Sequence, residues 1–182
     1  MIIKFTSQDI KKCKEFANKI DTGFYATRNQ SNNEKRIKDQ IVGKLGELAT
    51  YVYFKDKAVE LTQPDFKLYS KAEKSWDFDL KGNDINLHVK SQAIEQAKRY
   101  GESWIFQNQD KHIFRDVSDK DYVCFVTVDL DNQSAEIKSI VKLEELHKKD
   151  LFKKPKLAYL TSKSAVYFDD LKKTLKDKLL VK

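Results

Sequence analysis

Hydrophobic residues recur every three or four positions in two stretches near the start of the chain. Between Ser7 and Ile20 this spacing predicts an amphipathic helix, with Ser7 placed to cap its first turn. A longer helix is predicted from about Asn33 to Phe54, and the polar stretch 22–33 before it predicts a loop. The apolar positions are Ile10, Cys13, Phe16, Ala17 and Ile20 in the first helix and Ile37, Ile41, Leu45, Leu48 and Val52 in the second.

Two glycines, Gly43 and Gly46, interrupt the longer helix. An interior glycine lowers helix propensity by about 1 kcal/mol. A helix that keeps two of them either approaches another element closely at these positions or simply tolerates them.

Short apolar runs follow the long helix and predict strands separated by helical patterns. Strands are expected at 58–61, 66–69, 75–80, 85–91, 121–129, 135–141 and 156–161, and helices at 92–100, 143–149 and 164–175. Helices first, then strands with interleaved helices, predict an α/β or α+β fold, in which a central mixed β-sheet is flanked by helices. At 182 residues we expect one domain.

Composition and charge narrow the class of protein. Thirty-five Lys and Arg residues against 28 Asp and Glu residues give a formal charge of +7, which favours polyanionic partners, although lysine also serves simply as a solubilising residue. No apolar run approaches the roughly 20 residues that span a bilayer, and the N-terminus turns polar too early for a secretory signal. We therefore expect a cytoplasmic protein without a membrane partner.

The two cysteines are Cys13 and Cys124, far apart and outside any CxxC spacing. The second lies in an apolar run that predicts a buried strand. We expect free thiols, and neither a zinc site nor a disulfide.

The chemistry is concentrated in a predicted hairpin between Trp76 and Gln92. In 75–80 the residues alternate, so that Asp77 and Asp79 share the face opposite the apolar one. Composition places a turn at 81–84, and 85–92 alternates again, with Ile85, Leu87 and Val89 inward and Asn86, His88, Lys90 and Gln92 on the polar face.

A four-residue turn would pair Leu80 with Ile85, which puts Asp79 opposite Asn86 and Asp77 opposite His88. Asp77, His88 and Lys90 would then cluster on one surface. A carboxylate that holds Mg²⁺ beside a cation that orients or activates water is what phosphodiester hydrolysis requires. The alternative is an ordinary amphipathic hairpin with a polar outer face.

These residues resemble the core hairpin of the PD-(D/E)xK nuclease superfamily, which carries an aspartate on one strand and an acid-x-Lys triplet on the next. The resemblance implies that Asp77 is the first acid, that His88-Val89-Lys90 is the triplet, and that Mg²⁺ is the cofactor, with Mn²⁺ able to substitute. The triplet's acid is replaced by His88, a poorer partner for magnesium. Asp79 or Glu47 could supply the missing carboxylate, or His88 could contact the metal through water.

Glu47 stands in Gly43-Lys44-Leu45-Gly46-Glu47, which resembles the Gly-x-x-Gly-Glu stretch on the helix before the hairpin in several of these nucleases. The resemblance implies a glutamate directed toward the metal. On a helical wheel Glu47 falls on the flank of the apolar stripe, so it could reach a partly buried site. The alternative is a solvated glutamate.

The resemblance covers about 35–128, including 101–107 as a further strand, and residues 129–182 would complete the sheet and its helical cover. It implies a magnesium-dependent endonuclease, foremost a type II restriction endonuclease that cuts double-stranded DNA as a homodimer. The alternatives are a non-catalytic nucleic-acid-binding module and a structure-specific nuclease of repair or recombination. Lys90 would activate water and stabilise the transition state, and the candidate DNA contacts are Lys35, Arg36, Gln92, Lys98, Arg99, Gln107 and Asn108.

Overall fold

The structure is a computed structural model that describes residues 1–21, 33–69 and 78–175. The helices are α1 (Ser7–Asp21), α2 (Asn33–Asp56), α3 (Ile94–Tyr100), α4 (Lys111–Phe114), α5 (Leu143–Lys148) and α6 (Phe168–Thr174). The strands are β1 (Ile2–Lys4), β2 (Leu80–Lys81), β3 (Asn86–Ala93), β4 (Ser103–Gln107), β5 (Asp121–Asp129), β6 (Ser134–Lys142) and β7 (Lys163–Tyr167).

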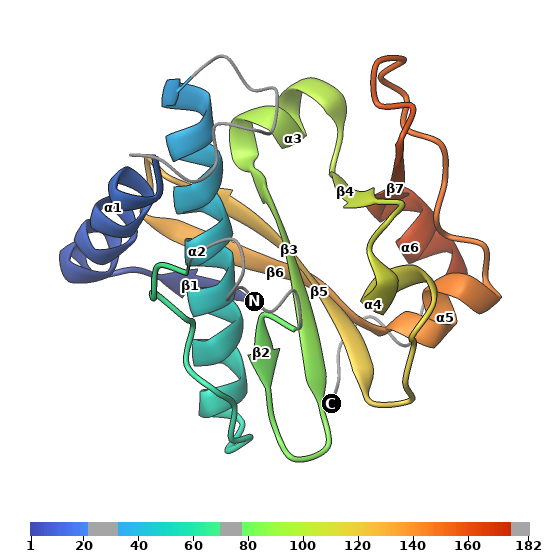
Figure 1. Cartoon of the computed structure of the whole chain (residues 1–182), viewed down its shortest axis with the longest axis horizontal. Helices are drawn as coiled ribbons and strands as arrows, with labels where there is room; N and C mark the ends of the chain where they lie inside the picture. The colour runs from blue at the N-terminus through green and yellow to red at the C-terminus, as the bar shows by residue number, and fades with distance from the viewer. Residues whose placement is uncertain (22–32, 70–77, 176–182) are drawn as a thin grey trace.

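A five-stranded mixed sheet forms the centre, in the order β1-β6-β5-β3-β2, and β4 pairs with β7 in a separate two-stranded ladder. β3 and β5 are parallel, while the other neighbours in the large sheet are antiparallel. The connection from β3 to β5 contains α3, β4 and α4. The prediction of a single α/β domain with a mixed sheet flanked by helices is confirmed (Figure 1).

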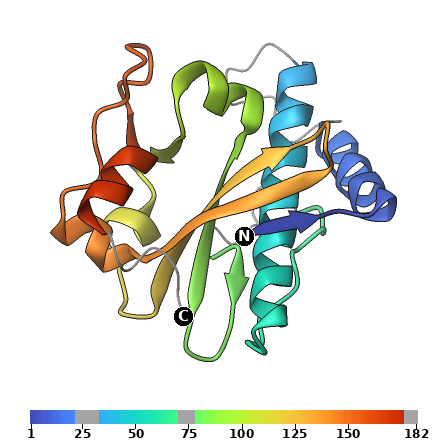
Figure 2. The ribbon, with the colours of Figure 1, turned by 180° about the vertical axis from the view of Figure 1, so that it is seen from behind.

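Helices cover both faces of the sheet, and each face has its own hydrophobic core. α1 and α2 lie on one side, whereas α4, α5, α6 and the β4–β7 ladder lie on the other (Figures 1 and 2). β5 contributes alternate residues to the two cores, with Cys124 and Val126 on the α2 side and Val123 and Phe125 on the other. Alternation along a strand puts successive side chains on opposite faces, so one strand fills both cores.

α2 approaches β3 closely at Gly46. A Cβ atom at this position would lie 1.8 Å from Ser91 Oγ, while one at Gly43 would have no atom within 4 Å. Each of the two interpretations therefore applies to one glycine: Gly46 permits a close contact, whereas Gly43 is merely tolerated.

Most predicted elements agree with the structure to within a few residues, but the cap and five segments do not. Of the strand expected at 75–80, residues 75–77 lie outside the described residues, as does the loop expected at 22–33 up to residue 32, and β2 begins only at Leu80. Thr6, not Ser7, caps α1, because its Oγ1 accepts a hydrogen bond from Asp9 N–H (3.2 Å) and Asp9 Oδ2 accepts one from Thr6 N–H (2.9 Å). Residues 58–61, 66–69 and 156–161 are not strands, and the helix expected over 164–175 begins only at Phe168. Its first part is β7, which pairs with β4.

Both cysteines are buried and free, as expected. Within the described ranges no helix is long and apolar enough to cross a membrane.

Candidate functional site

The β2–β3 hairpin pairs Leu80 with Leu87 and Lys81 with Asn86. The predicted register, Leu80 with Ile85 and Asp79 with Asn86, is therefore wrong by two positions. The turn comprises Gly82 to Ile85 instead, and it is closed by a hydrogen bond from Gly82 N–H to Ile85 O (2.8 Å). Lys81 stays in the ladder because Thr62 holds its other edge: Thr62 Oγ1 accepts a bond from Lys81 N–H (2.9 Å).

Asp79 lies just before this ladder, and its carboxylate reaches across to the middle of the triplet. Its Oδ2 accepts a hydrogen bond from the backbone N–H of Val89 (2.7 Å), and its own N–H donates to Leu87 O (3.0 Å). Asp79 is exposed. The structure thus brings a carboxylate to the residue that separates His88 from Lys90. Asp77 lies outside the described residues.

His88 is buried, with 4% of its surface exposed. Its ring centroid lies 4.8 Å from that of Phe78, and the Phe78 centroid also lies 5.5 Å from that of His112. Burial, aided by the positive charge of Lys90 and by His112, lowers the pKa of His88 to about 3. His88 is therefore a neutral imidazole near pH 7, and its Nε2 atom is buried without a hydrogen-bond partner.

The face of β3 that carries His88, Lys90 and Gln92 was predicted to be polar and outward-facing, and that prediction is wrong. β3 is an inner strand, paired along its whole length with β5. The β4–β7 ladder covers the face that carries these three side chains. Gln92 is buried and bridges two backbone groups: its Nε2 donates to Gly101 O (3.1 Å) and its Oε1 accepts from Ser103 N–H (3.0 Å). This amide anchors the connection from α3 to β4.

Lys90 is half-buried, and its Nζ lies 4.9 Å from the ring centroid of Phe106 on β4. An ammonium group over an aromatic face is attracted by the ring quadrupole. Phe106 therefore orients the Lys90 side chain. The positive charge of Lys90 contributes to the lowered pKa of His88.

Glu47 belongs to the contact between α1 and α2. Its Oε2 pairs with Lys44 Nζ at 2.7 Å, and only 13–14% of either side chain is exposed. Lys44 Nζ also lies over Phe16 of α1 (5.1 Å). α2 covers the face of β3 lined by Val89 and Ser91, opposite the face of His88 and Lys90. The structure therefore places Glu47 with the helix pair, across the sheet from Lys90.

The donors at the triplet differ in how well they suit a magnesium ion. Within residues 1–21, 33–69 and 78–175, no group of three or more His, Cys, Asp and Glu side chains could hold a metal ion. The exposed carboxylate of Asp79 fits, because magnesium prefers oxygen ligands. His88 does not fit, since it offers nitrogen and its Nε2 is enclosed.

The candidate DNA contacts occupy three places. Lys98 and Arg99 are exposed in the last turn of α3. Lys35 and Arg36 lie in the first turn of α2, where Arg36 Nη2 donates to Asn33 Oδ1 (2.8 Å). Gln107 ends β4 and Asn108 follows it, with Asn108 Oδ1 accepting a bond from Ser164 Oγ (2.8 Å).

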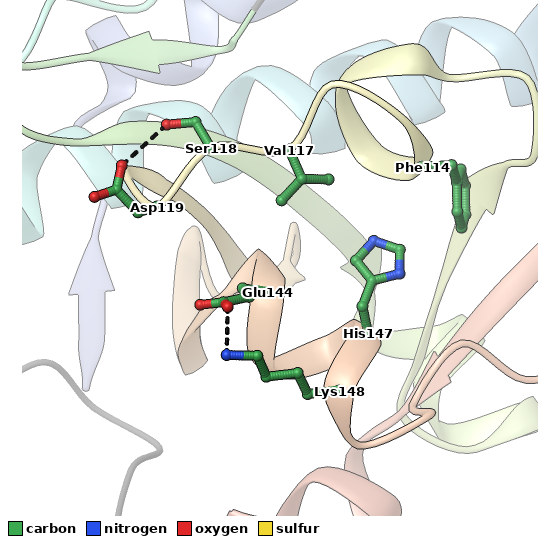
Figure 3. A pocket seen from close by; sticks show the side chains of 7 residues that line it. All are labelled: Phe114, Val117, Ser118, Asp119, Glu144, His147 and Lys148. Atoms are coloured by element: carbon green, nitrogen blue, oxygen red, sulfur yellow. Dashed lines mark hydrogen bonds and ion pairs between the residues drawn. The ribbon is translucent and has the colours of Figure 1, made fainter.

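A pocket of about 360 Å³ lies between α5 and the segment from α4 to β5. It is lined by Phe114, Val117, Ser118, Asp119, Glu144, His147 and Lys148 (Figure 3). Glu144 and Lys148 pair with each other along α5, and His147 Nε2 lies 2.7 Å from Ile113 O. The segment that lines this pocket adjoins the turn of the hairpin, since Lys120, next to Asp119, pairs with Asp84 (3.0 Å).

Sequence reasoning missed two residues beside the triplet, His112 and Phe106. Nothing in the local sequence around His112 signals that α4 brings it to Phe78. Phe106 could have been found, because alternation along 103–107 places it with Trp104 on the buried face. No protein-family model, curated protein or solved structure matches this chain.

Proposed function

We propose that the chain is a magnesium-dependent endonuclease that hydrolyses DNA phosphodiester bonds at the β2–β3 hairpin. The observation that carries this proposal is the hydrogen bond from Val89 N–H to Asp79 Oδ2 (2.7 Å). It fixes a carboxylate at the centre of His88-Val89-Lys90, with the ammonium group of Lys90 one residue away. A carboxylate that holds a metal ion close to a cation suits metal-assisted hydrolysis of a phosphodiester.

In this proposal Asp79 holds the magnesium ion, together with Asp77 as the second carboxylate. The bound metal supplies charge stabilisation and an acidified water. Lys90, held over Phe106, orients the attacking water and stabilises the negative charge that develops on the phosphorus oxygens. His88 is a neutral group behind the site, which keeps water from that side of β3 and is no metal ligand.

The finer proposal is a type II restriction endonuclease of the PD-(D/E)xK class that cuts duplex DNA. Because each chain has one small site, cutting both strands of a duplex requires two copies, which a two-fold homodimer provides. Mn²⁺, which accepts oxygen and nitrogen ligands more readily than Mg²⁺, should substitute.

The test is a cleavage assay on long duplex DNAs with Mg²⁺ and with EDTA, resolved on a gel. Asp79→Asn keeps an oxygen for Val89 N–H but removes the charge, so we expect cleavage to fall by roughly a hundredfold or more. Asp84→Asn is the matched control, because Asp84 lies in the turn of the same hairpin and pairs with Lys120 (3.0 Å). Lys90→Ala should also stop turnover while DNA binding persists, and near-normal cutting by either site variant would move the site elsewhere.

A second candidate is a nucleic-acid-binding module without catalysis. The observation that favours it is the enclosure of His88 where the triplet has its acid, together with the pairing of Glu47 to Lys44. DNA binding without magnesium-dependent cleavage would select this candidate. Cleavage of forks or junctions, but not of plain duplex, would instead select a nuclease of repair or recombination.

A further inference from the structure

The segment Lys153 to Lys163, here called the lysine loop, connects α5 to β7. It contains Lys153, Lys154, Lys156 and Lys163, and no acidic residue occurs from 151 to 168. Lys153 is paired with Asp150 (2.6 Å). Within the described ranges Lys154 and Lys163 have no carboxylate partner. Unpaired lysines in one loop form a local positive patch.

Short contacts anchor the base of the lysine loop. Lys153 N–H and Lys153 O both bond to the backbone of Ala165 (2.8 Å each). Lys156 N–H donates to the hydroxyl of Tyr167 (2.8 Å), and Lys156 Nζ lies 4.8 Å from the Tyr167 ring centroid. The loop therefore starts from a fixed position beside β7.

Tyr159 stands at the tip with 75% of its surface exposed, more than any other large hydrophobic residue in the described part of the chain. Hydrogen bonds from Leu160 N–H to Leu157 O (3.0 Å) and from Lys163 N–H to Leu160 O (3.2 Å) shape the turns on either side. An exposed aromatic ring among lysines offers a flat apolar face within a positive field.

The lysine loop adjoins the face of β3 that carries Lys90. Lys163 pairs with Gln107, and Ser164 pairs with Phe106, the residue under Lys90. Asn108 N–H donates to Ser162 O (3.4 Å). Lys90 Nζ lies 4.9 Å from the ring centroid of Phe106, and one ladder step of about 5 Å separates β4 from β7. Figure 1 shows the loop rising beyond β4 and β7 at the same end of the molecule as α3.

We propose that the lysine loop binds unpaired nucleotides of a nucleic acid beside the hairpin. Lys154 and Lys163 would contact phosphates, and Tyr159 would stack on a base. Positive grooves with aromatic platforms bind single strands without sequence preference, because every base has a face on which a ring can stack. The proposal rests on the proposed function in taking nucleic acid as the ligand, and it adds the strand state that this loop recognises.

The test measures binding of the full chain to a fluorescent single-stranded oligonucleotide and to a blunt duplex in EDTA, where no metal-dependent cleavage occurs. Tyr159→Ala should weaken single-strand binding about tenfold, while Tyr159→Phe keeps the ring and should retain it. The double variant Lys154→Gln/Lys163→Gln should lower the slope of log affinity against log salt by about 1.4 for the single strand. Lys14→Gln/Lys55→Gln is the charge-matched control on α1 and α2, across the sheet.

Single-strand affinity that is unchanged in Tyr159→Ala would overturn the proposal. So would equal losses in the loop variant and in the α1–α2 control, or a loss confined to the duplex. Because the measurement needs no cleavage, it separates the two proposals: normal loop-dependent binding by a chain that never cuts DNA would reject the nuclease alone.

Discussion

His88 is the residue whose role in the structure differs most from the role that its sequence pattern predicted. By pattern it occupies the place of a metal-binding acid, but in the fold its ring packs against Phe78 and 4% of its surface is exposed. Burial disfavours the charged imidazolium, and Lys90 next to it acts in the same direction. His88 is thus a neutral core residue with a strong effect on stability in acid.

We expect the stability of the protein to fall below pH 6.5 partly through His88. Its pKa is about 3 in the folded state, against 6.5 ordinarily, so between these values the unfolded chain binds more protons and unfolding is favoured as pH falls. Replacing it in His88→Gln should remove about 1.4 kcal/mol per pH unit from that dependence. Urea unfolding between pH 7 and pH 4 measures the difference.

His147→Gln is the control for replacing a histidine at an exposed position. Parallel curves for the original chain and His88→Gln would show that the imidazole is not buried as a neutral group.

At the scale of elements, the contact of α2 with β3 fixes the strand that carries the triplet. Gly46 faces Ser91 at a distance that leaves no room for a Cβ, whereas Gly43 on the next turn faces open space. The same substitution at these two positions therefore has opposite expected effects.

Gly46→Ala should destabilise the protein by about 1–3 kcal/mol, because the methyl group forces Ser91 or the helix to move. Gly43→Ala should be neutral or stabilise by up to about 1 kcal/mol, since alanine is the better helix former. The free energy of unfolding in urea gives both values. A similar cost at the two positions would mean that helix propensity, and not close packing, governs this face of α2.

Elements with a strong period could be predicted, and those defined by distant partners could not. The stripes of α1 and α2 and the apolar run of β5 are local signals, and their predicted limits lie within a few residues of the observed ones. The hairpin register depended on Thr62, which holds Lys81 from another segment. The helix predicted over 164–175 begins only at Phe168, because 163–167 pairs with β4, a distant partner that local periodicity does not reveal. Of the candidate site, the sequence indicated Asp79 and Lys90, but not the burial of His88 or the nearness of Phe106.

For the molecule as a whole, the sheet separates two surfaces that carry different groups. α1 and α2 cover one face (Figures 1 and 2). The side chain of Lys90 lies on the other face, against β4, whose partner β7 follows the lysine loop. α3 follows β3 and is joined to α2 by the ion pair of Lys38 with Glu95 (3.4 Å). The formal charge of +7 does not indicate which surface would bind a polyanion. The distribution of the lysines over the two faces decides that.

Duplex DNA binding should weaken steeply with salt, because lysines that contact phosphates release condensed counterions. The double variant Lys98→Gln/Arg99→Gln, at the exposed end of α3, should lower the slope of log affinity against log salt by about 1.8. Lys14→Gln/Lys55→Gln on the other face should leave the slope nearly unchanged. Filter binding across a range of salt concentrations measures it, and a flat response in the original chain would contradict nucleic-acid binding.

The parallel pairing of β3 with β5 also determines when the hairpin site can exist. Asn86 and its partner Asp121 are 35 residues apart in the chain, whereas β5 and β6 join through a short turn. Contacts between distant residues form late, since a long loop must close first. In a chain that is still being synthesised, β3 would therefore lack its parallel partner until β5 has been made. Asp79 and Lys90 would not be held in place before that. Under the proposed function, synthesis itself would delay cleavage until β5 is present, so that a partly made chain would not cut DNA.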